Sequence, residues 1–229
     1  MVPNLAVAHP LPRAQQKTVM IFGPKGGLGK TTIAAHLVVA SAKAGYSTLG
    51  LDFDPQKTLA RWRSYRTDNP VAEKLADFDL ATAQLKDWED AWQHVADYDV
   101  TILDMPPSVE GHEAAIFDLA KAVDLVLIPT GASRYDWDIA IDWMALFKTR
   151  CFKNVRFLIN KVPDFRRKSF LRIHGLLSRH GLILPISLPL RDDVFLSTDQ
   201  GLTTMDLVDA KGSAEFEVLW NNVYQELGL

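Results

Sequence analysis

A glycine-rich segment, VMIFGPKGGLGKTTIAAHL at residues 19–37, is the part of the sequence best suited to binding phosphate. Gly26, Gly27 and Gly29 allow the backbone to turn so that its N–H groups face an anion, and the dipole of a following helix attracts negative charge. Lys30 would then reach the β- and γ-phosphates of a nucleotide, and the hydroxyl of Thr31 would bind Mg²⁺. The chemistry that these residues predict is nucleotide binding and phosphoryl transfer.

The same segment departs from the common phosphate-loop pattern G-x-x-x-x-G-K-[ST] in two ways. Pro24 stands where that pattern has glycine, and a second lysine, Lys25, precedes the paired glycines. A flexible ammonium at the entrance of the loop can stabilise charge that grows on phosphate oxygens, and a solvated surface lysine is the alternative. Thr32 is placed to help hold the α-phosphate.

Aspartates stand at the ends of two strand-like runs further along the chain. LGLDFDPQ (49–56) contains Asp52 and Asp54, and VTILDMPPS (100–108) contains Asp104. Residues two apart in a strand point to the same face, so Asp52 and Asp54 can address one site. They can instead remain solvated or cap the helix expected after them. Asp104 would reach Mg²⁺ through its water shell, because magnesium keeps several waters and takes few carboxylates.

Short apolar runs alternate with helical patterns and would position these groups. We expect strands at residues 18–23, 47–53, 99–105, 123–129 and 155–160, with two weaker runs at 78–83 and 183–189. We expect helices at residues 31–44, 55–67, 84–96, 110–121, 135–149, 166–180 and 213–227. Several runs lack polar alternation, as strands buried on both faces of a parallel sheet do. The pattern predicts a doubly wound α/β fold, with a mostly parallel sheet and helices on both faces.

Length and composition limit the protein class. A chain of 229 residues is enough for one sizeable domain, which we expect at residues 17–229 after a flexible N-terminal tail at residues 1–16. The net charge of −3 argues against a generally basic nucleic-acid binder, but not against a local basic patch. Cys151 is the only cysteine, which excludes disulfides and cysteine-held clusters within one chain. No signal peptide or membrane-spanning run is visible, so we expect a cytoplasmic protein.

The motifs together resemble those of the ParA/MinD family of deviant Walker A ATPases. KGGLGKTT (25–32) is similar to the family pattern K-G-G-x-G-K-[ST]-T, in which the glycine replaced by Pro24 is not required. LGLDFDPQ and VTILDMPPS resemble the Walker A′ and Walker B motifs of the family. The resemblance implies a P-loop fold that binds ATP and Mg²⁺, and a homodimer that closes over the nucleotides.

The resemblance also implies roles for single residues. Lys25 would cross the dimer interface to the nucleotide of the other subunit, Lys30 would serve its own, and Asp54 would position the attacking water. The metal would lie near Thr31, Asp104 and Asp52. The nucleotide would be held by residues 25–32, Leu28 included, and by Asn160, which occupies the position of the family's adenine-reading asparagine.

A local basic stretch, KVPDFRRKSFLRIHGLLSRH (161–180), contains six Lys or Arg residues and one Asp. At about 100° per residue, Lys168, Arg172 and Arg179 fall on one side of a helix, with apolar residues opposite. Such a ridge suits sequence-independent contact with a phosphate backbone, although a solubilising surface is the alternative. Arg166 and Arg167 point elsewhere and are further candidates for DNA contact.

The function that the resemblance implies is a partition or positioning cycle. The ATP-bound dimer would bind DNA non-specifically and associate with the nucleoid, and a ParB-like or other adaptor protein would stimulate hydrolysis. The first expected strand begins near residue 17, which leaves no room for a preceding helix-turn-helix domain. One alternative is a MinD-like regulator that cycles on membranes, but the last helix, SAEFEVLWNNVYQELGL, has no Lys or Arg to attract anionic lipid. Another is an ATP-dependent metabolic enzyme, which would need a second substrate pocket.

Overall fold

The computed structural model describes residues 16–108, 110–163 and 167–229, apart from the side chains of residues 167–169. Of the expected tail at residues 1–16, only Gln16 lies within this description. The centre is a seven-stranded sheet in the order β3-β2-β4-β1-β5-β6-β7, and every strand pair is parallel. The strands are β1 Lys17–Ile21, β2 Thr48–Asp52, β3 Asp79–Thr82, β4 Val100–Asp104, β5 Leu125–Thr130, β6 Val155–Val162 and β7 Ile183–Pro189.

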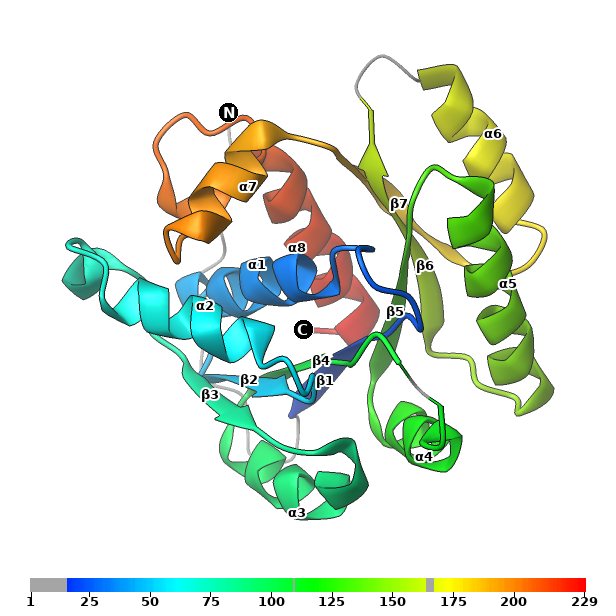
Figure 1. The fold of residues 1–229 in the computed structure, drawn as a ribbon, viewed down its shortest axis with the longest axis horizontal. Coiled ribbons are helices and arrows are strands. Elements are labelled where there is room, and N and C mark those ends of the chain that lie inside the picture. The colour runs from blue at the N-terminus through cyan, green and yellow to red at the C-terminus, as the bar shows by residue number, and fades with distance from the viewer. Residues whose placement is uncertain (1–15, 109, 164–166) are drawn as a thin grey trace.

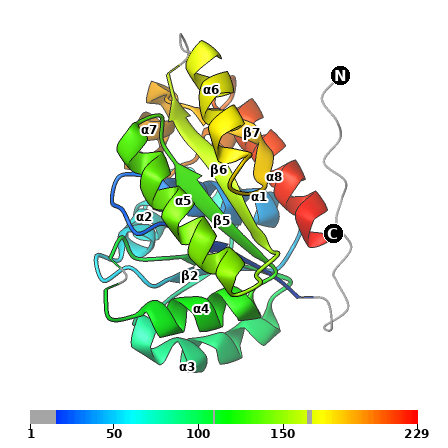
Figure 2. The same ribbon diagram turned by 90° about the vertical axis from the view of Figure 1, so that its right-hand side faces the viewer.

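Helices cover both faces of the sheet, as the doubly wound prediction requires (Figure 1). One apolar cluster joins the sheet to α1, α2 and α8, and a second joins its other face to α3, α4, α5 and α6. Figure 2 shows α5 and α6 lying side by side over β5 and β6. The helices are α1 Lys30–Lys43, α2 Thr58–Thr67, α3 Trp88–Trp92, α4 Glu113–Ala122, α5 Arg134–Thr149, α6 Arg167–Leu177, α7 Asp192–Asp199 and α8 Ser213–Leu227.

The central strands confirm that uninterrupted apolar runs become strands buried on both faces. Every residue of β2, β4 and β5 is buried. The strand order places β1 between β4 and β5, with β2 and β3 beyond β4 and with β6 and β7 beyond β5. In sheets of this kind, ligands bind beyond the carboxyl ends of the strands where the order reverses. The segment after β1 lies at that point.

The register brings the candidate carboxylates level with the phosphate loop. Asp104 at the end of β4 is the Cα partner of Asp52 in β2 and of Ile21 in β1. The last residues of these neighbouring strands therefore form one edge, from which the loops after β1, β2 and β4 rise together.

Two expected helices are shorter than predicted, and one observed helix was not predicted. The helix expected at 84–96 is α3 alone, flanked by 3-10 turns at 85–87 and 93–97. Helix α6 ends at Leu177 rather than at residue 180, and a tight turn leads to Gly181, where an added Cβ would lie 2.8 Å from the Met144 side chain. Helix α7 was not predicted, although Asp192 and Asp193 in its first turn suit the positive end of a helix dipole.

The last helix, α8, packs on the sheet as the spacing of its apolar residues predicts. Its contacts are with β7, α1 and the 3-10 turn at 204–206. The buried residues of α8 are Phe216, Leu219, Trp220, Val223 and Leu227. The apolar face of α8 is therefore used inside the fold.

Candidate functional site

The glycine-rich loop connects β1 to α1 in the conformation that its glycines allow. Gly27 and Gly29 have φ angles of 79° and 83°, in the left-handed region that favours glycine. Gly29 caps α1 without a side-chain hydrogen bond, so the first N–H groups of the helix are available to an anion. The Leu28 side chain is buried, which leaves only its backbone for a nucleotide.

Lys30 begins α1 and is buried beneath this loop. Its Nζ donates a hydrogen bond to the Lys25 carbonyl at 3.0 Å. Burial lowers the pKa of Lys30, and the nearby carboxylates of Asp104 and Asp54 partly oppose the shift. An ammonium in a buried, hydrogen-bonded position next to acidic groups is well placed to meet the charge of a phosphate.

Asp104 is the most unusual polar group of the site. It is fully buried, and neither carboxylate oxygen has a hydrogen-bond partner among the described residues. Burial raises the pKa of Asp104 to about 7, with Asp52 adding to the shift while the Thr31 hydroxyl and Lys30 oppose it. Burying a carboxylate without a hydrogen-bond partner costs free energy, which indicates that the Asp104 carboxylate binds a ligand. A free carboxylate beside a threonine hydroxyl is a donor set that fits a hydrated Mg²⁺.

Asp52 and Asp54 have local partners that Asp104 lacks. The Asp52 carboxylate accepts hydrogen bonds from the backbone N–H groups of Asp54 at 2.9 Å and Ala60 at 3.1 Å. Burial raises the pKa of Asp52, and these backbone bonds oppose the shift. Asp54 is half-buried, and its Oδ1 accepts from the backbone N–H of Gln56 at 2.9 Å. Both acids therefore shape the turn into α2, and Asp104 is the better metal candidate.

Asn160 holds the phosphate loop directly. Its Nδ2 donates to the Leu28 carbonyl at 2.7 Å, and its Oδ1 accepts from the backbone N–H of Lys161 at 2.8 Å. The Lys161 ammonium donates to the Gly27 carbonyl at 2.7 Å. The role of Lys161 was not predicted, because only the fold places the end of β6 against the loop.

A small pocket lies beside Asn160 where an adenine was expected. Its lining includes Thr32 of α1, Asn160, and the Pro189–Arg191 backbone that follows β7. The amide, hydroxyl and backbone groups of this lining offer both donors and acceptors to a base edge. The assignment of Asn160 to adenine remains a prediction, since its amide here serves the loop.

Lys25 contacts an acid that was not predicted for the site. Its ammonium forms an ion pair with Asp136, in the first turn of α5. Burial would raise the pKa of Asp136, but its contacts with Lys25 and Ser133 outweigh burial and hold that pKa below its usual value. The approach requires a glycine at residue 131, where an added Cβ would lie 2.4 Å from Asp136 Oδ2.

The residues predicted to contact DNA lie apart from the phosphate loop, on and after α6. Arg172 and Arg179 are exposed, and Ile173 and Leu177 on the other side of the helix are buried, as predicted. Arg167 and Lys168 lie in α6, but their side chains fall outside the description. Arg166 itself lies outside the described residues.

None of the described helices combines the length and the apolar character needed to cross a bilayer. The parallel sheet, the loop after β1 and the buried carboxylate at the end of β4 together define a P-loop nucleotide-binding fold. Residues 19–204 match the family described as the CobQ/CobB/MinD/ParA nucleotide binding domain. The protein therefore belongs to the ParA/MinD family of P-loop ATPases.

Individual relatives agree with this assignment. Over 126 residues the chain is 29% identical to the maintenance of carboxysome distribution protein A of Gloeobacter kilaueensis, a match that covers 55% of this chain and 54% of the relative. An ATP complex of McdA from Cyanothece superposes with a TM-score of 0.69 at 20% identity, covering 94% of this chain and 97% of that one. MinD of Aquifex aeolicus superposes with a TM-score of 0.73 at 18% identity, covering 91% and 97%. These structures share the fold, and the sequence match spans about half of the carboxysome-distribution relative.

Proposed function

We propose that this protein is an ATPase that dimerises on binding ATP and Mg²⁺, binds DNA non-specifically as the dimer, and leaves DNA after hydrolysis. The observation that carries the proposal is the unpartnered, buried carboxylate of Asp104 beside Lys30 and Thr31. Together these residues offer a metal ligand and a phosphate-binding cation at the edge of the sheet where P-loop proteins hold nucleotides.

The phosphate loop would bind the substrate through its backbone and a few side chains. Backbone N–H groups of residues 26–29 and of the first turn of α1 face the phosphates, Lys30 contacts the β- and γ-phosphates, and Thr32 holds the α-phosphate. Thr31 and Asp104 would hold Mg²⁺, with Asp52 behind them. The ion supplies positive charge that neutralises the phosphate oxygens during transfer.

Hydrolysis would use Asp54 and both lysines of the loop. Asp54 accepts a hydrogen bond from a water and orients its oxygen toward the γ-phosphorus. As the bond between the water oxygen and the γ-phosphorus forms, the bond from that phosphorus to the bridging oxygen breaks. ADP keeps the bridging oxygen, and the released phosphate carries the oxygen of the water, whose lost proton passes to phosphate or solvent. Lys30 would stabilise the negative charge that develops on the phosphate oxygens in its own subunit. Lys25 would stabilise the same charge in the other subunit, which requires a homodimer with the nucleotides at its interface.

DNA binding and cargo positioning follow from the basic residues and from the relatives. Arg172 and Arg179 are exposed and would contact the phosphate backbone, with Arg166, Arg167 and Lys168 as further candidates. A relative named for carboxysome distribution and another named as a chromosome-partitioning ATPase support a positioning role. The cargo would be a plasmid, a chromosome region or a protein assembly, coupled through a ParB-like or other adaptor.

The variant Asp54→Ala tests the catalytic assignment. We expect it to bind ATP and form the ATP-dependent dimer, with turnover reduced by roughly a hundredfold or more, because the water loses its positioning group. ATP hydrolysis and light scattering would be measured beside Glu89→Ala, which removes an exposed acid on α3 and should leave both unchanged. Turnover preserved in Asp54→Ala would refute the role of Asp54, and failure of the wild-type protein to bind ATP would refute the proposal.

A further inference from the structure

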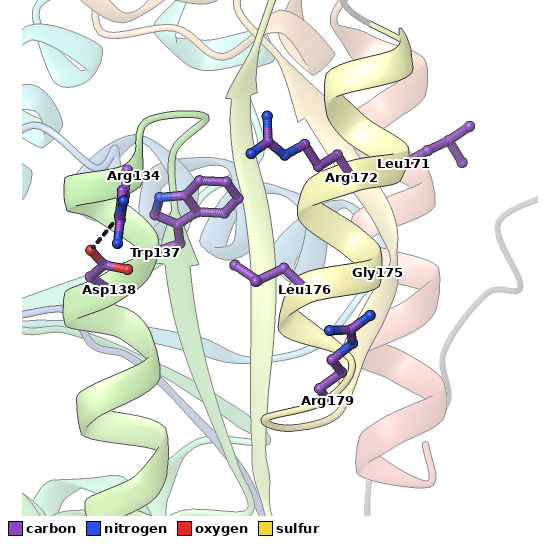
Figure 3. Close-up of a pocket in the computed structure, with 8 residues that line it drawn as sticks. All are labelled: Arg134, Trp137, Asp138, Leu171, Arg172, Gly175, Leu176 and Arg179. Carbon is purple, nitrogen blue, oxygen red and sulfur yellow. Dashed lines mark ion pairs between the residues drawn. The ribbon is translucent and has the colours of Figure 1, made fainter.

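A groove lies between α5 and α6, apart from the nucleotide site. Its volume is about 500 Å³. Figure 3 shows Arg172 and Leu176 reaching from α6 toward Trp137 on α5, with Arg134 beside Trp137 and Arg179 at the far end. The lining extends along α6 from Leu171 to Leu176, roughly 7 Å at the rise of a helix, and continues to Arg179 in the turn that follows. That length suits a short extended segment of chain.

The groove carries an excess of positive charge. Arg134 pairs with Asp138 at 3.4 Å, whereas Arg172 and Arg179 form no ion pair with any acid among the described residues. Asp138 is the only acid in the lining, which therefore holds two cations without a counterion. Although the net charge of the protein is −3, two arginines without an ion pair lie together in this groove. An acidic ligand would complement their charge.

The floor of the groove is apolar and has room for a side chain. Trp137 is half-buried and packs in the apolar core beneath α5, and Leu176 is likewise half-buried. Gly175 lies between the arginines in α6, and a Cβ added there would meet no atom within 4 Å. The surface over Gly175 is therefore open to a side chain of a bound partner.

We propose that this groove is a docking site for a short acidic segment of another protein. Its Asp or Glu side chains would pair with Arg172 and Arg179, and an apolar or aromatic side chain would pack on Trp137 and Leu176 over Gly175. A concave, partly apolar floor favours a peptide over duplex DNA, whose backbone needs an outward-facing cationic surface. Residues 1–16 of this chain contain no acid, so they are not the occupant.

Docking would also affect the proposed DNA contact and the phosphate loop. Arg172 and Arg179 are also candidates for DNA contact, so an acidic segment and DNA would compete for them. This competition rests on the proposed function, whereas docking of the segment does not. The first turn of α5 carries both the groove residue Trp137 and the adjacent Asp136, which pairs with Lys25. A partner that packs on Trp137 would therefore lie next to Asp136, the residue that pairs with Lys25.

The test measures binding of a labelled peptide in which glutamates flank a Phe-Leu pair, by fluorescence anisotropy on the full chain. Two control peptides carry Lys in place of Glu, or Ser in place of Phe and Leu. The blocking variant is Gly175→Leu, which fills the floor without changing charge, and Gly175→Ala is its matched control. We expect binding to wild type and Gly175→Ala, and binding about tenfold weaker in Gly175→Leu and in Arg172→Glu.

The outcomes separate this proposal from the proposed function. No binding of the acidic peptide, equal binding of the Ser peptide, or unchanged affinity in Gly175→Leu would overturn the docking site. Gly175→Leu could also lose duplex-DNA affinity by as large a factor as it loses peptide affinity. That result would show that the groove binds nucleic acid, and it would overturn the docking site as well. Circular dichroism checks that each variant is folded. If Gly175→Leu is unfolded, the test relies on Arg172→Glu, which changes an exposed side chain. Full peptide affinity in Arg172→Glu would then overturn the docking site. Peptide binding without any DNA binding by wild type would overturn the DNA part of the proposed function alone.

Discussion

The ammonium of Lys25 forms an ion pair with Asp136 of its own chain. The family resemblance implies that this lysine reaches the nucleotide of a second subunit, so Asp136 would compete with that nucleotide for the ammonium. The pair is partly exposed, with 37% of the Lys25 side chain and 16% of the Asp136 side chain accessible to solvent. Opening it would therefore precede closure of the dimer.

Removing Asp136 should favour the dimer. In Asp136→Ala the lysine is released, and a partly exposed ion pair of up to about 1 kcal/mol no longer opposes closure. We expect ATP-dependent dimerisation at a protein concentration lower by up to about fivefold, measured by sedimentation. Asp138→Ala removes an acid from the same turn that pairs with Arg134 instead, and should cause no shift. Dimerisation equal in the two variants would contradict this role of Asp136.

The two ends of the phosphate loop should differ in their tolerance of a methyl group. Gly29 has a φ of 83°, and an added Cβ would lie 2.5 Å from Asn160 Nδ2, so Gly29→Ala should lose ATP binding and about 2 kcal/mol or more of stability. Gly26 has no atom within 4 Å of an added Cβ, so Gly26→Ala should stay within about 0.5 kcal/mol of wild type. Urea unfolding and ATP titration measure both, and equal losses would refute the difference.

Asn160 should matter for loop stability as well as for nucleotide affinity. Asn160→Ala leaves the Leu28 carbonyl without its 2.7 Å donor, at a cost of about 1–3 kcal/mol for a buried group. Lys161→Met removes the more exposed bond to the Gly27 carbonyl and should cost less than about 1 kcal/mol. Both should weaken ATP binding in calorimetry, Asn160→Ala more strongly. The reverse order would show that the ammonium, not the amide, holds the loop.

His36 should make stability depend on pH. Its Nδ1 lies 2.8 Å from the Thr32 carbonyl and its Nε2 lies 3.3 Å from the backbone N of Thr204, an arrangement that suits the neutral ring with Nδ1 protonated. The ring also stacks on Phe216 at 3.6 Å between centroids. Burial lowers the pKa of His36 from 6.5 to about 4.

The sign of this dependence follows from the lowered pKa. Between pH 6.5 and 4 the unfolded chain binds a proton that the folded chain excludes, so stability falls as the pH falls through this window. The contribution is complete above pH 6.5 and amounts to at most about 3 kcal/mol. Urea midpoints at several pH values should fall more steeply for wild type than for His36→Gln. Parallel curves for the two proteins would be the contrary result.

The sheet and the glycine-rich turn between β1 and α1 were predictable from the sequence because their signals are local. Uninterrupted apolar runs predict the buried strands, and the glycines with Lys30 and Thr31 predict the anion site. Asp104 was predicted from its place at the end of such a run. Its lack of any hydrogen bond among the described residues, which sets it apart from Asp52, required the structure.

The remaining contacts depend on packing between distant segments. Lys25 and Asp136 are 111 residues apart, and Lys161 and Gly27 are 134 apart. No local pattern links such pairs, since only the strand order places β5 beside β1 and β6 beside β5. Helix α7 was not predicted because it has only eight residues, too few for a clear helical pattern.

The most direct test of the account is duplex-DNA binding with ATP, with ADP and without nucleotide, over a range of salt concentrations. The account predicts tight binding with ATP alone, weakening steadily as salt rises, and further weakened in Arg172→Glu with a smaller salt dependence. Glu89→Ala, which changes an exposed charge on α3, should bind like wild type. Equal affinity in all three nucleotide states, or no DNA binding with ATP, would contradict the claim that the nucleotide site controls DNA binding.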